Sequence, residues 1–256
     1  MKSQSFQVSK ILQNYTLCQN CAKRLVSKSN GKKYLKSNKL SESKCYVCKD
    51  TFETLDSMLF IIYEKINSFD FKSFNLGLTL KNSYLERDDY IKSKFKIKGI
   101  ENLKSSISDE LAKKISKKTK SRKITEDYDL FLQVNLKDDS CIIRSKPILV
   151  YGRYNKKIRK ISQKLKSCKS CNGFGCHNCN FTGLENIETV EGKISYFLKK
   201  KFDANKVQIN WIGGEDQSSL VLGNGRPFFA KIINPKKRNR LLRKSSDLDA
   251  VSLSEL

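Results

Sequence analysis

The sequence contains few of the groups on which several common kinds of site depend. Of its 256 residues only one, His177, is a histidine, and 26 are aspartate or glutamate. Because serine and cysteine nucleophiles usually need a neighbouring histidine as base, a Ser/His or Cys/His catalytic group is poorly supported. His177 lies between two cysteines, where we expect a surface residue rather than a metal ligand or a catalytic group.

Long apolar runs are also absent. No stretch of 18 or more apolar residues occurs, so no segment is expected to span a membrane as a helix. Residues 1–17 lack the apolar core and the small-residue cleavage site of a signal peptide. We therefore expect a cytoplasmic protein, in which the nine cysteines favour metal binding or reactive thiols over disulfides.

Positive charge, in contrast, is abundant. The 51 lysines and arginines outnumber the acids and give a net charge of +25. This charge favours a polyanionic partner, either nucleic acid or, less readily, an anionic membrane surface, although part of the lysine excess merely solvates the surface. With 38% hydrophobic residues the chain can still build ordinary cores, as one large domain or two small ones.

Eight of the nine cysteines form four CxxC pairs. The first two pairs are separated by 23 residues and the last two by only four, with Gly173 and Gly175 permitting the tight reversal. Tetrahedral zinc needs four ligands, and each CxxC turn supplies two, which makes redox-active or merely buried thiols the weaker interpretation. We expect one or two structural zinc ions, because pairs from the two sets could also combine. The predicted ligands are Cys18, Cys21, Cys45 and Cys48, and Cys168, Cys171, Cys176 and Cys179.

Residues 51–165 have the composition and periodicity of a globular α/β or α+β domain. Apolar spacing predicts helices over 55–66 and 91–118 and strands over 74–80, 129–134 and 141–151. Cys141, in the last strand, is expected to be a buried thiol. Basic and aromatic residues then interleave, a pattern that suits phosphate contact and base stacking, or else is a solvated face. The candidates for RNA contact are Tyr151, Arg153, Tyr154, Lys156, Lys157 and Arg159, with Arg226 further along the chain.

The segment Trp211–Phe228 carries Glu215 and Asp216 on a glycine turn, followed by a second tight turn at 223–225. A helix over 190–201 and strands over 206–211 and 228–233 surround it, and residues 245–256 are expected to form a frayed or partial helix. A carboxylate on a turn between strands can act as a nucleophile or base, although acids are also ordinary turn residues.

Four segments, in order, resemble the archaeal-type tRNA pseudouridine synthases of the Pus-ten family. They are the N-terminal cysteine pairs, the run ILVYGRY with the basic residues behind it, the knuckle CKSCNGFGCHNCNFTG with Glu188 and Glu191 after it, and the segment GGEDQSSLVLGNGRPFFAKIINPKKR. The last two in succession are the most specific, and the resemblance covers nearly the whole chain.

The resemblance implies an α+β multidomain fold. Its parts would be a zinc-binding N-terminal module at 1–50, a THUMP-like RNA-binding domain at 51–165, a zinc knuckle at 166–183, and the N-terminal part of a pseudouridine synthase catalytic sheet at 184–256. It also implies transfer RNA as partner and isomerisation of uridine-54 and/or uridine-55 in the TψC arm. In this chemistry Asp216 is the nucleophile and no organic cofactor takes part.

Two departures favour an alternative. The family pattern is Arg-Glu-Asp-x-Asp-x-Arg, and Gly214, Ser218 and Leu220 stand at its first Arg, second Asp and second Arg. The family's catalytic domain also continues well beyond the strand at 228–233, where this chain has 23 further residues. A sheet cut short would expose its strand edges. The alternative is a non-catalytic, zinc-stabilised tRNA-binding protein, or the RNA-binding half of a split or truncated synthase completed by a second polypeptide.

Overall fold

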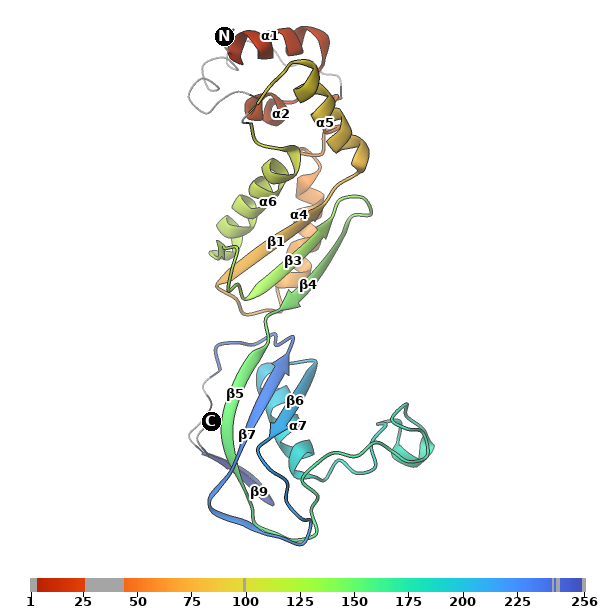
Figure 1. Ribbon diagram of the computed structural model, residues 1–256, viewed down its shortest axis with the longest axis vertical. Helices are drawn as coiled ribbons and strands as arrows, with labels where there is room; N and C mark the ends of the chain where they lie inside the picture. The colour runs from red at the N-terminus through yellow and green to blue at the C-terminus, as the bar shows by residue number, and fades with distance from the viewer. Residues whose placement is uncertain (1–3, 26–43, 99, 241, 243–244, 255–256) are drawn as a thin grey trace. The chain divides into compact units, whose positions relative to one another are not determined.

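The computed structural model describes residues 4–25, 44–98, 100–240, 242 and 245–254. They divide into two compact units (Figure 1), one made of Met1–Asn67 with Phe71–Arg144 and the other of Ser68–Asp70 with Ser145–Leu256. The expected domain boundaries at 50, 165 and 183 stay predictions, because this division separates compact units only. The N-terminal cysteine module belongs to the first unit, and residues 145–165 belong to the second.

The first unit contains a four-stranded sheet in the order β2-β1-β3-β4. Strand β1 pairs in parallel with both β2 and β3, and the helices α4, α5 and α6 complete the unit, with α6 contacting β1 and β2. On β1 the side chains Phe74, Leu76 and Leu78 are buried in alternation, as expected of a strand with one covered face. The bounds are β1 (Ser73–Thr79), β2 (Arg122–Lys123), β3 (Leu130–Asn135), β4 (Ser140–Ser145), α4 (Leu55–Ile66), α5 (Asn82–Lys94) and α6 (Leu103–Thr119).

Helices α1 (Gln4–Asn14) and α2 (Gln19–Arg24) precede this sheet. Arg24 forms a buried ion pair with Asp88 of α5, and Lys92 approaches the same carboxylate at 2.7 Å. The Asp88 carboxylate also accepts a hydrogen bond from the Leu103 amide at 3.3 Å. Because removing one member of a buried charge cluster leaves the others uncompensated, these contacts fix the N-terminal module on the rest of the unit.

The helix predicted over 91–118 is wrong as a single element. Helix α5 ends at Lys94, Lys96 adopts a left-handed backbone conformation with φ of 52°, and α6 starts after Asn102. The Asn102 side chain accepts a hydrogen bond from the Ser105 amide at 2.8 Å, which is the geometry of a helix N-cap. The apolar spacing continues across this break, so the periodicity does not distinguish two helices from one.

The strand predicted over 141–151 is also two strands. Strand β4 ends at Ser145, and β5 (Ile148–Lys156) starts directly after Pro147 and belongs to another sheet. Proline has no amide hydrogen to donate to a strand ladder. The chain passes from the first unit to the second between Arg144 and Ser145, just before this break.

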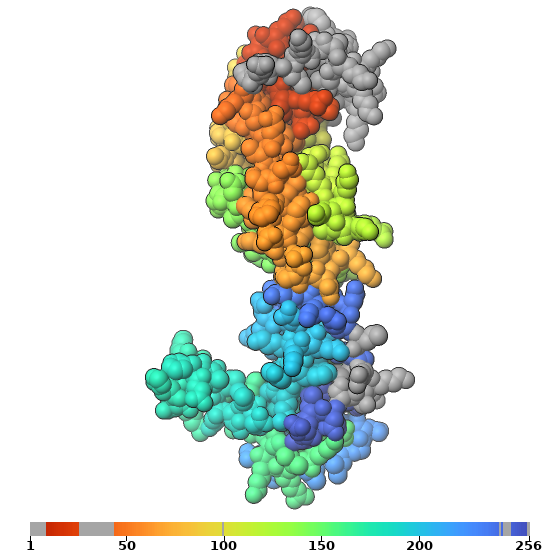
Figure 2. Space-filling model, turned by 180° about the vertical axis from the view of Figure 1, so that it is seen from behind, coloured from red at the N-terminus to blue at the C-terminus, as the bar shows by residue number. Residues whose placement is uncertain are grey.

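The second unit is built on a five-stranded sheet with the order β6-β7-β5-β9-β8, in which neighbouring strands pair antiparallel. One face is covered by α7 (Val190–Phe202), which lies behind the sheet in Figure 1 and faces the viewer in Figure 2. Val190, Ile194, Leu198 and Phe202 of α7 meet buried residues of the sheet such as Phe228 and Ile232. The remaining bounds are β6 (Lys206–Trp211), β7 (Val221–Ile233), β8 (Ser245–Leu248) and β9 (Val251–Ser254).

The helix expected at 245–256 is wrong, because β8 and β9 form a hairpin there. Asp249 takes a left-handed conformation with φ of 59° at the turn. The buried residues Val251 and Leu253 alternate with the less buried Ser252 and Ser254, a period of two that is typical of a strand. Strand β9 pairs with β5 from Arg153 to Lys156 and so covers this part of the β5 edge. No helix among the described residues is long and apolar enough to cross a membrane.

Candidate active site and metal centres

The loop that carries Asp216, residues 212–220, joins β6 to β7. Its backbone carbonyls are held by groups from elsewhere in the second unit. The Lys156 ammonium donates to Asp216 O at 3.2 Å, the Lys160 amide to Gln217 O at 2.8 Å, the Gln163 side chain to Gly213 O at 3.3 Å, and the Arg226 guanidinium to Gly214 O. A loop restrained at four carbonyls places its side chains in defined positions.

Glu215 anchors this loop in the core. Its side chain and that of Lys156 are both 0% exposed, and Lys156 Nζ lies 3.1 Å from Glu215 Oε1. The Tyr154 hydroxyl donates to Oε2 at 3.0 Å and accepts from Gln163 at 2.9 Å. Burial raises the pKa of Tyr154, so its phenol stays protonated and can donate. The charge of Glu215 is thus compensated where it is buried.

Asp216, the next residue, is exposed. Its Oδ1 accepts hydrogen bonds from the Ser218 amide at 2.7 Å and the Ser218 hydroxyl at 2.6 Å. These two bonds, the hydroxyl first, hold the pKa of Asp216 below its ordinary value, and the Lys156 charge adds to the effect. The carboxylate is therefore ionised at neutral pH and faces solvent.

The tight turn expected at 223–225 is instead an irregularity within β7. Gly223 and Gly225 have φ of 63° and 70°, and the β5–β7 register shifts between Tyr154 and Lys156. A Cβ on Gly225 would lie 2.6 Å from Tyr154 O, so a side chain would displace the strand that carries the Glu215 anchor. The Arg153 guanidinium binds Asn224 O at 2.6 Å and Gly225 O at 2.9 Å.

The residues expected to contact RNA fall into two groups. Tyr154 and Lys156 are 0% exposed, which corrects their expected place at the surface: alternation along β5 directs them toward α7, where they support the Asp216 loop. Tyr151, Lys157 and Arg159 are exposed, and Arg153 and Arg226 are partly buried. Lys157 pairs with Asp247 at 2.8 Å.

Sequence reasoning gave no role to Gln163 and none to Glu215 beyond the turn. Gln163 is an amide in a basic segment and Glu215 an acid in a glycine turn, so neither carries a local signal of burial. Both meet at the Tyr154 hydroxyl, which accepts from Gln163 and donates to Glu215.

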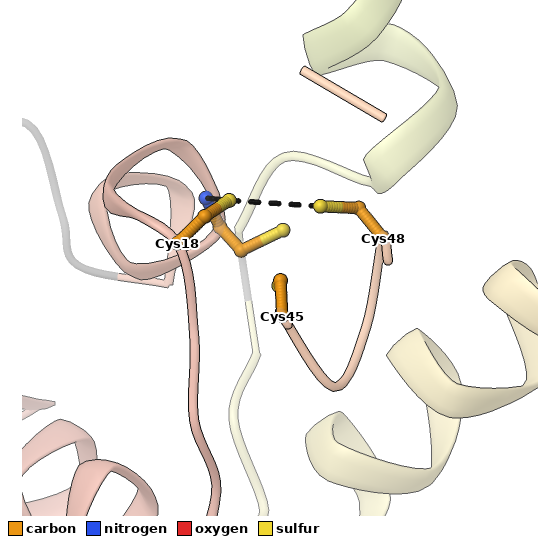
Figure 3. Close-up of side chains that lie close together, drawn as sticks. Cys18, Cys45 and Cys48 are labelled. Atoms are coloured by element: carbon orange, nitrogen blue, oxygen red, sulfur yellow. Dashed lines mark hydrogen bonds between the residues drawn. The ribbon is translucent and has the colours of Figure 1, made fainter. Parts of the chain in front are cut away.

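The N-terminal cysteines form one cluster, with the ligand atoms of Cys18, Cys21, Cys45 and Cys48 all within 4.8 Å of one another. Figure 3 shows the side chains of Cys18, Cys45 and Cys48 close together, and the sulfurs of Cys18 and Cys48 lie 3.6 Å apart. Sulfurs around a tetrahedral zinc are separated by roughly 3.8 Å, given a Zn–S bond of about 2.3 Å. The cluster fits such an ion.

The second cluster consists of Cys168, Cys171, Cys176 and Cys179. Sulfur–sulfur distances of 3.9 Å (168 to 176) and 3.8 Å (171 to 179) also match tetrahedral coordination. The amides of Cys176 and Gly183 donate to Cys179 Sγ, and these bonds lower the pKa of Cys179 to about 6, which favours the thiolate that binds metal.

The two clusters are complete within their own segments, so pairs from different sets do not combine. His177 is exposed and packs against Phe181 at 4.8 Å between ring centroids, as expected of a surface residue. Cys141 is a buried thiol, as predicted, and burial raises its pKa to about 11.

Comparison with known proteins gives two matching family models. Residues 61–135 match the "Pus10 THUMP domain, archaeal", and residues 149–251 match "Pus10, C-terminal". The latter region contains β5, the cysteine knuckle, α7 and the Asp216 loop. Both units of the structure are therefore represented in one family, and the comparisons give no support to a second polypeptide.

Curated relatives named "tRNA pseudouridine synthase Pus10" include proteins of Nitrosopumilus maritimus, Cenarchaeum symbiosum and Archaeoglobus fulgidus. They are 45%, 30% and 33% identical over 96%, 88% and 76% of this chain. The chain spans 66%, 58% and 54% of the length of these relatives. The matched domains and these identities, in the order that the motifs predict, confirm the resemblance: the chain belongs to the archaeal Pus10 family.

Proposed function

We propose that this chain carries the nucleophile and tRNA-binding parts of a tRNA pseudouridine synthase, with Asp216 as the catalytic carboxylate. The proposal extends to this chain what the names of its relatives say of them. The substrate would be uridine-54 and/or uridine-55 of the TψC arm. The observation that carries the proposal is an ionised, exposed carboxylate on a loop restrained at four carbonyls.

The chemistry requires no redox step. Asp216 attacks C1′ of the ribose or removes a ribose proton, and the bond between N1 and C1′ breaks. The freed uracil then turns so that C5 bonds to C1′, which displaces Asp216 in the first route and is followed by return of the ribose proton in the second. The proton on C5 leaves, N1 gains a proton, and Asp216 is regenerated. A uridine must first leave its stack, at a cost of a few kcal/mol, which phosphate contacts at a strongly basic surface can offset.

The absence of arginine at position 214 is the main argument for the second candidate, a tRNA-binding protein without activity. Beside Gly214 the space is open, with nothing within 4 Å of a Cβ placed there. The Arg226 guanidinium nevertheless binds Gly214 O from β7. We infer that Arg226 restrains this end of the loop from outside, which favours the synthase over the inactive binder.

Each cysteine cluster is proposed to hold one structural zinc ion. Support comes from the four-thiolate donor sets and from sulfur spacings that fit tetrahedral coordination. A zinc ion in such a site contributes to folding and has no open coordination position for substrate. No organic cofactor is needed for an isomerisation of this kind.

The test uses unmodified transfer RNA, transcribed in vitro, incubated with the purified protein and mapped for pseudouridine by mass spectrometry of nuclease fragments. We expect product at uridine-54, uridine-55 or both, and none when cytidine replaces both. Tight binding without any product would reject the synthase for this chain and favour the second candidate. Product only at uridines outside the TψC arm would reject the proposed substrate positions.

A further inference from the structure

On the face of the second sheet opposite α7, several apolar side chains are exposed and do not pack in the core. Leu149 is 78% exposed, Phe229 48% and Tyr151 41%. In Figure 1 this face is turned to the viewer, and no described element crosses it. An exposed apolar patch on a sheet that already has a covered face is a common sign of a binding surface.

These side chains are neighbours across two strands. Tyr151 of β5 pairs in register with Phe229 of β7, and their ring centroids lie 5.4 Å apart. Leu149 pairs with Lys231 two positions further along. Because alternate residues of a strand share a face, Leu149, Tyr151, Phe229 and Lys231 lie on one side of the sheet.

Most polar groups on this side are cationic or neutral. On β6, Gln208 pairs with Lys231 and Asn210 with Phe229, and Lys206 shares their face at the start of the strand. Lys206, Gln208, Asn210 and Lys231 are exposed. On β9, Ser254 pairs with Arg153. On β8, Asp247 pairs with Ser252, which pairs with Asn155, so the register also places the Asp247 carboxylate on this side, where Lys157 pairs with it at 2.8 Å.

We propose that this face, defined by Tyr151, Phe229, Leu149 and Lys231, binds single-stranded RNA, with bases stacked on the Tyr151–Phe229 pair and phosphates beside Lys231 and Lys206. The inference rests on the proposed function, in that RNA is taken as the partner. Stacking on aromatic side chains accepts any base, and cations beside the rings suit the phosphate backbone. Amides such as Gln208 and Asn210 can reach the edges of a stacked base. A partner protein that offered only an apolar face would leave Lys206 and Lys231 without an anionic partner.

Binding is measured by fluorescence anisotropy with a labelled oligouridylate of five nucleotides and with an abasic strand of equal charge. We expect the protein to prefer the oligouridylate, because only that strand has bases to stack. The variant F229A, or F229L where a conservative apolar replacement is needed for folding, should weaken oligouridylate binding by about 5- to 150-fold, the range found for loss of one stacked base. Its binding of the abasic strand should not change.

Tyr196 supplies the matched control. It is also an exposed aromatic residue, 67% accessible against 48% for Phe229, but it lies on α7 and so on the other side of the unit. Y196A should bind both strands as the wild type does. K231A should reduce the slope of log affinity against log salt by about 0.7, the value for one phosphate contact with a single strand.

Equal binding of the two strands by the wild type, or unchanged oligouridylate binding by F229A and F229L, would overturn the proposal. Lack of any oligouridylate binding would overturn it in favour of a protein segment on this face. These outcomes are distinct from failure of the proposed function: a protein that binds oligouridylate through Phe229 but forms no pseudouridine would leave the surface standing and reject the synthase.

Discussion

At the scale of residues, the candidate site depends on the different environments of two adjacent acids. Glu215 is buried against Lys156 and Tyr154, whereas Asp216 is exposed and bound by Ser218. The first acid is used to fix the loop, and the second is left available for chemistry. In the sequence both are acids of a glycine turn. They differ in the structure because Tyr154 and Lys156 of β5 contact Glu215 and bury it.

Ser218 provides a test of how the charge of Asp216 is maintained. Because the Ser218 hydroxyl is the largest cause of the lowered pKa of Asp216, S218A should raise that pKa toward its ordinary value. If Asp216 must be ionised to act, the variant becomes protonated, and so loses activity, at a higher pH than the wild type does on acidification. The acid limb of the pH–rate profile for pseudouridine formation should therefore move to higher pH in S218A.

S219A is the control for this shift. The Ser219 hydroxyl donates to the backbone oxygen of Asp216 at 2.8 Å and does not touch its carboxylate. Its acid limb should coincide with that of the wild type. An identical displacement in both variants would show that loop disturbance, rather than the hydrogen bond to Oδ1, sets the profile.

At the scale of elements, local patterns predicted those segments whose burial follows one simple period. The bounds of α4 and β6 agree with the sequence prediction, α7 is longer by one residue at its C-terminal end, and β1 and β3 are each displaced by one residue at both ends. Failures arose where a pattern continued through a break, as at Asn102 and Pro147, or where it was short. The alternation of Val251 to Ser254 did carry a strand signal, but four residues beside a basic segment were too few to outweigh a helix interpretation.

The anchor element β5 could be recognised only as an apolar and basic strand. Whether Tyr154 and Lys156 or Tyr151 and Arg153 face the core depends on which side α7 covers, and periodicity alone cannot decide that. The sequence therefore predicts RNA contact for Tyr154 and Lys156, although both side chains are buried.

The buried ion pair should dominate the stability of this element. K156M leaves the Glu215 carboxylate buried without its cation, and we expect a loss of about 3–5 kcal/mol in the free energy of unfolding of the second unit. Trp211, the one tryptophan of the chain, packs against Tyr154 with ring centroids 5.3 Å apart. Its fluorescence during urea denaturation reports this unit.

K157M is the matched comparison. Lys157 is the next residue and also pairs with an acid, but its side chain and that of Asp247 are 47% and 65% exposed. Exposed pairs contribute about 0–1 kcal/mol, so K157M should differ little from the wild type. Equal destabilisation by the two variants would refute the role assigned to the Lys156–Glu215 pair.

At the scale of the whole molecule, the two cysteine clusters belong to different units, one at the N-terminus of the first and one within the second. Spacing predicted all eight ligand candidates, but it could not partition them, because each CxxC turn is chemically equivalent. The boundary at Arg144 was likewise hidden, since the strand pattern runs on through Pro147. The boundary follows from long-range strand pairing, to which local patterns are insensitive, whereas each cysteine cluster closes within its own segment.

Metal content tests the partition. Native mass spectrometry should find two zinc ions in the wild type, one in C179S and two in C141S, because Cys141 is a buried thiol outside both clusters. Removing one of four ligands weakens a structural site strongly. A single zinc ion in the wild type, or loss of both ions in C179S, would contradict two independent sites.

The central claim is that the exposed carboxylate of Asp216 performs the chemistry on a uridine held by this molecule. D216N keeps the size of the side chain and removes its charge, and the backbone contacts that hold the loop do not involve its carboxylate. The most direct measurement is pseudouridine formed in unmodified transfer RNA under single-turnover conditions, with tRNA affinity measured on the same preparations. We predict product from the wild type and none above background from D216N, at equal affinity. Equal rates of product formation by the two proteins would contradict the account.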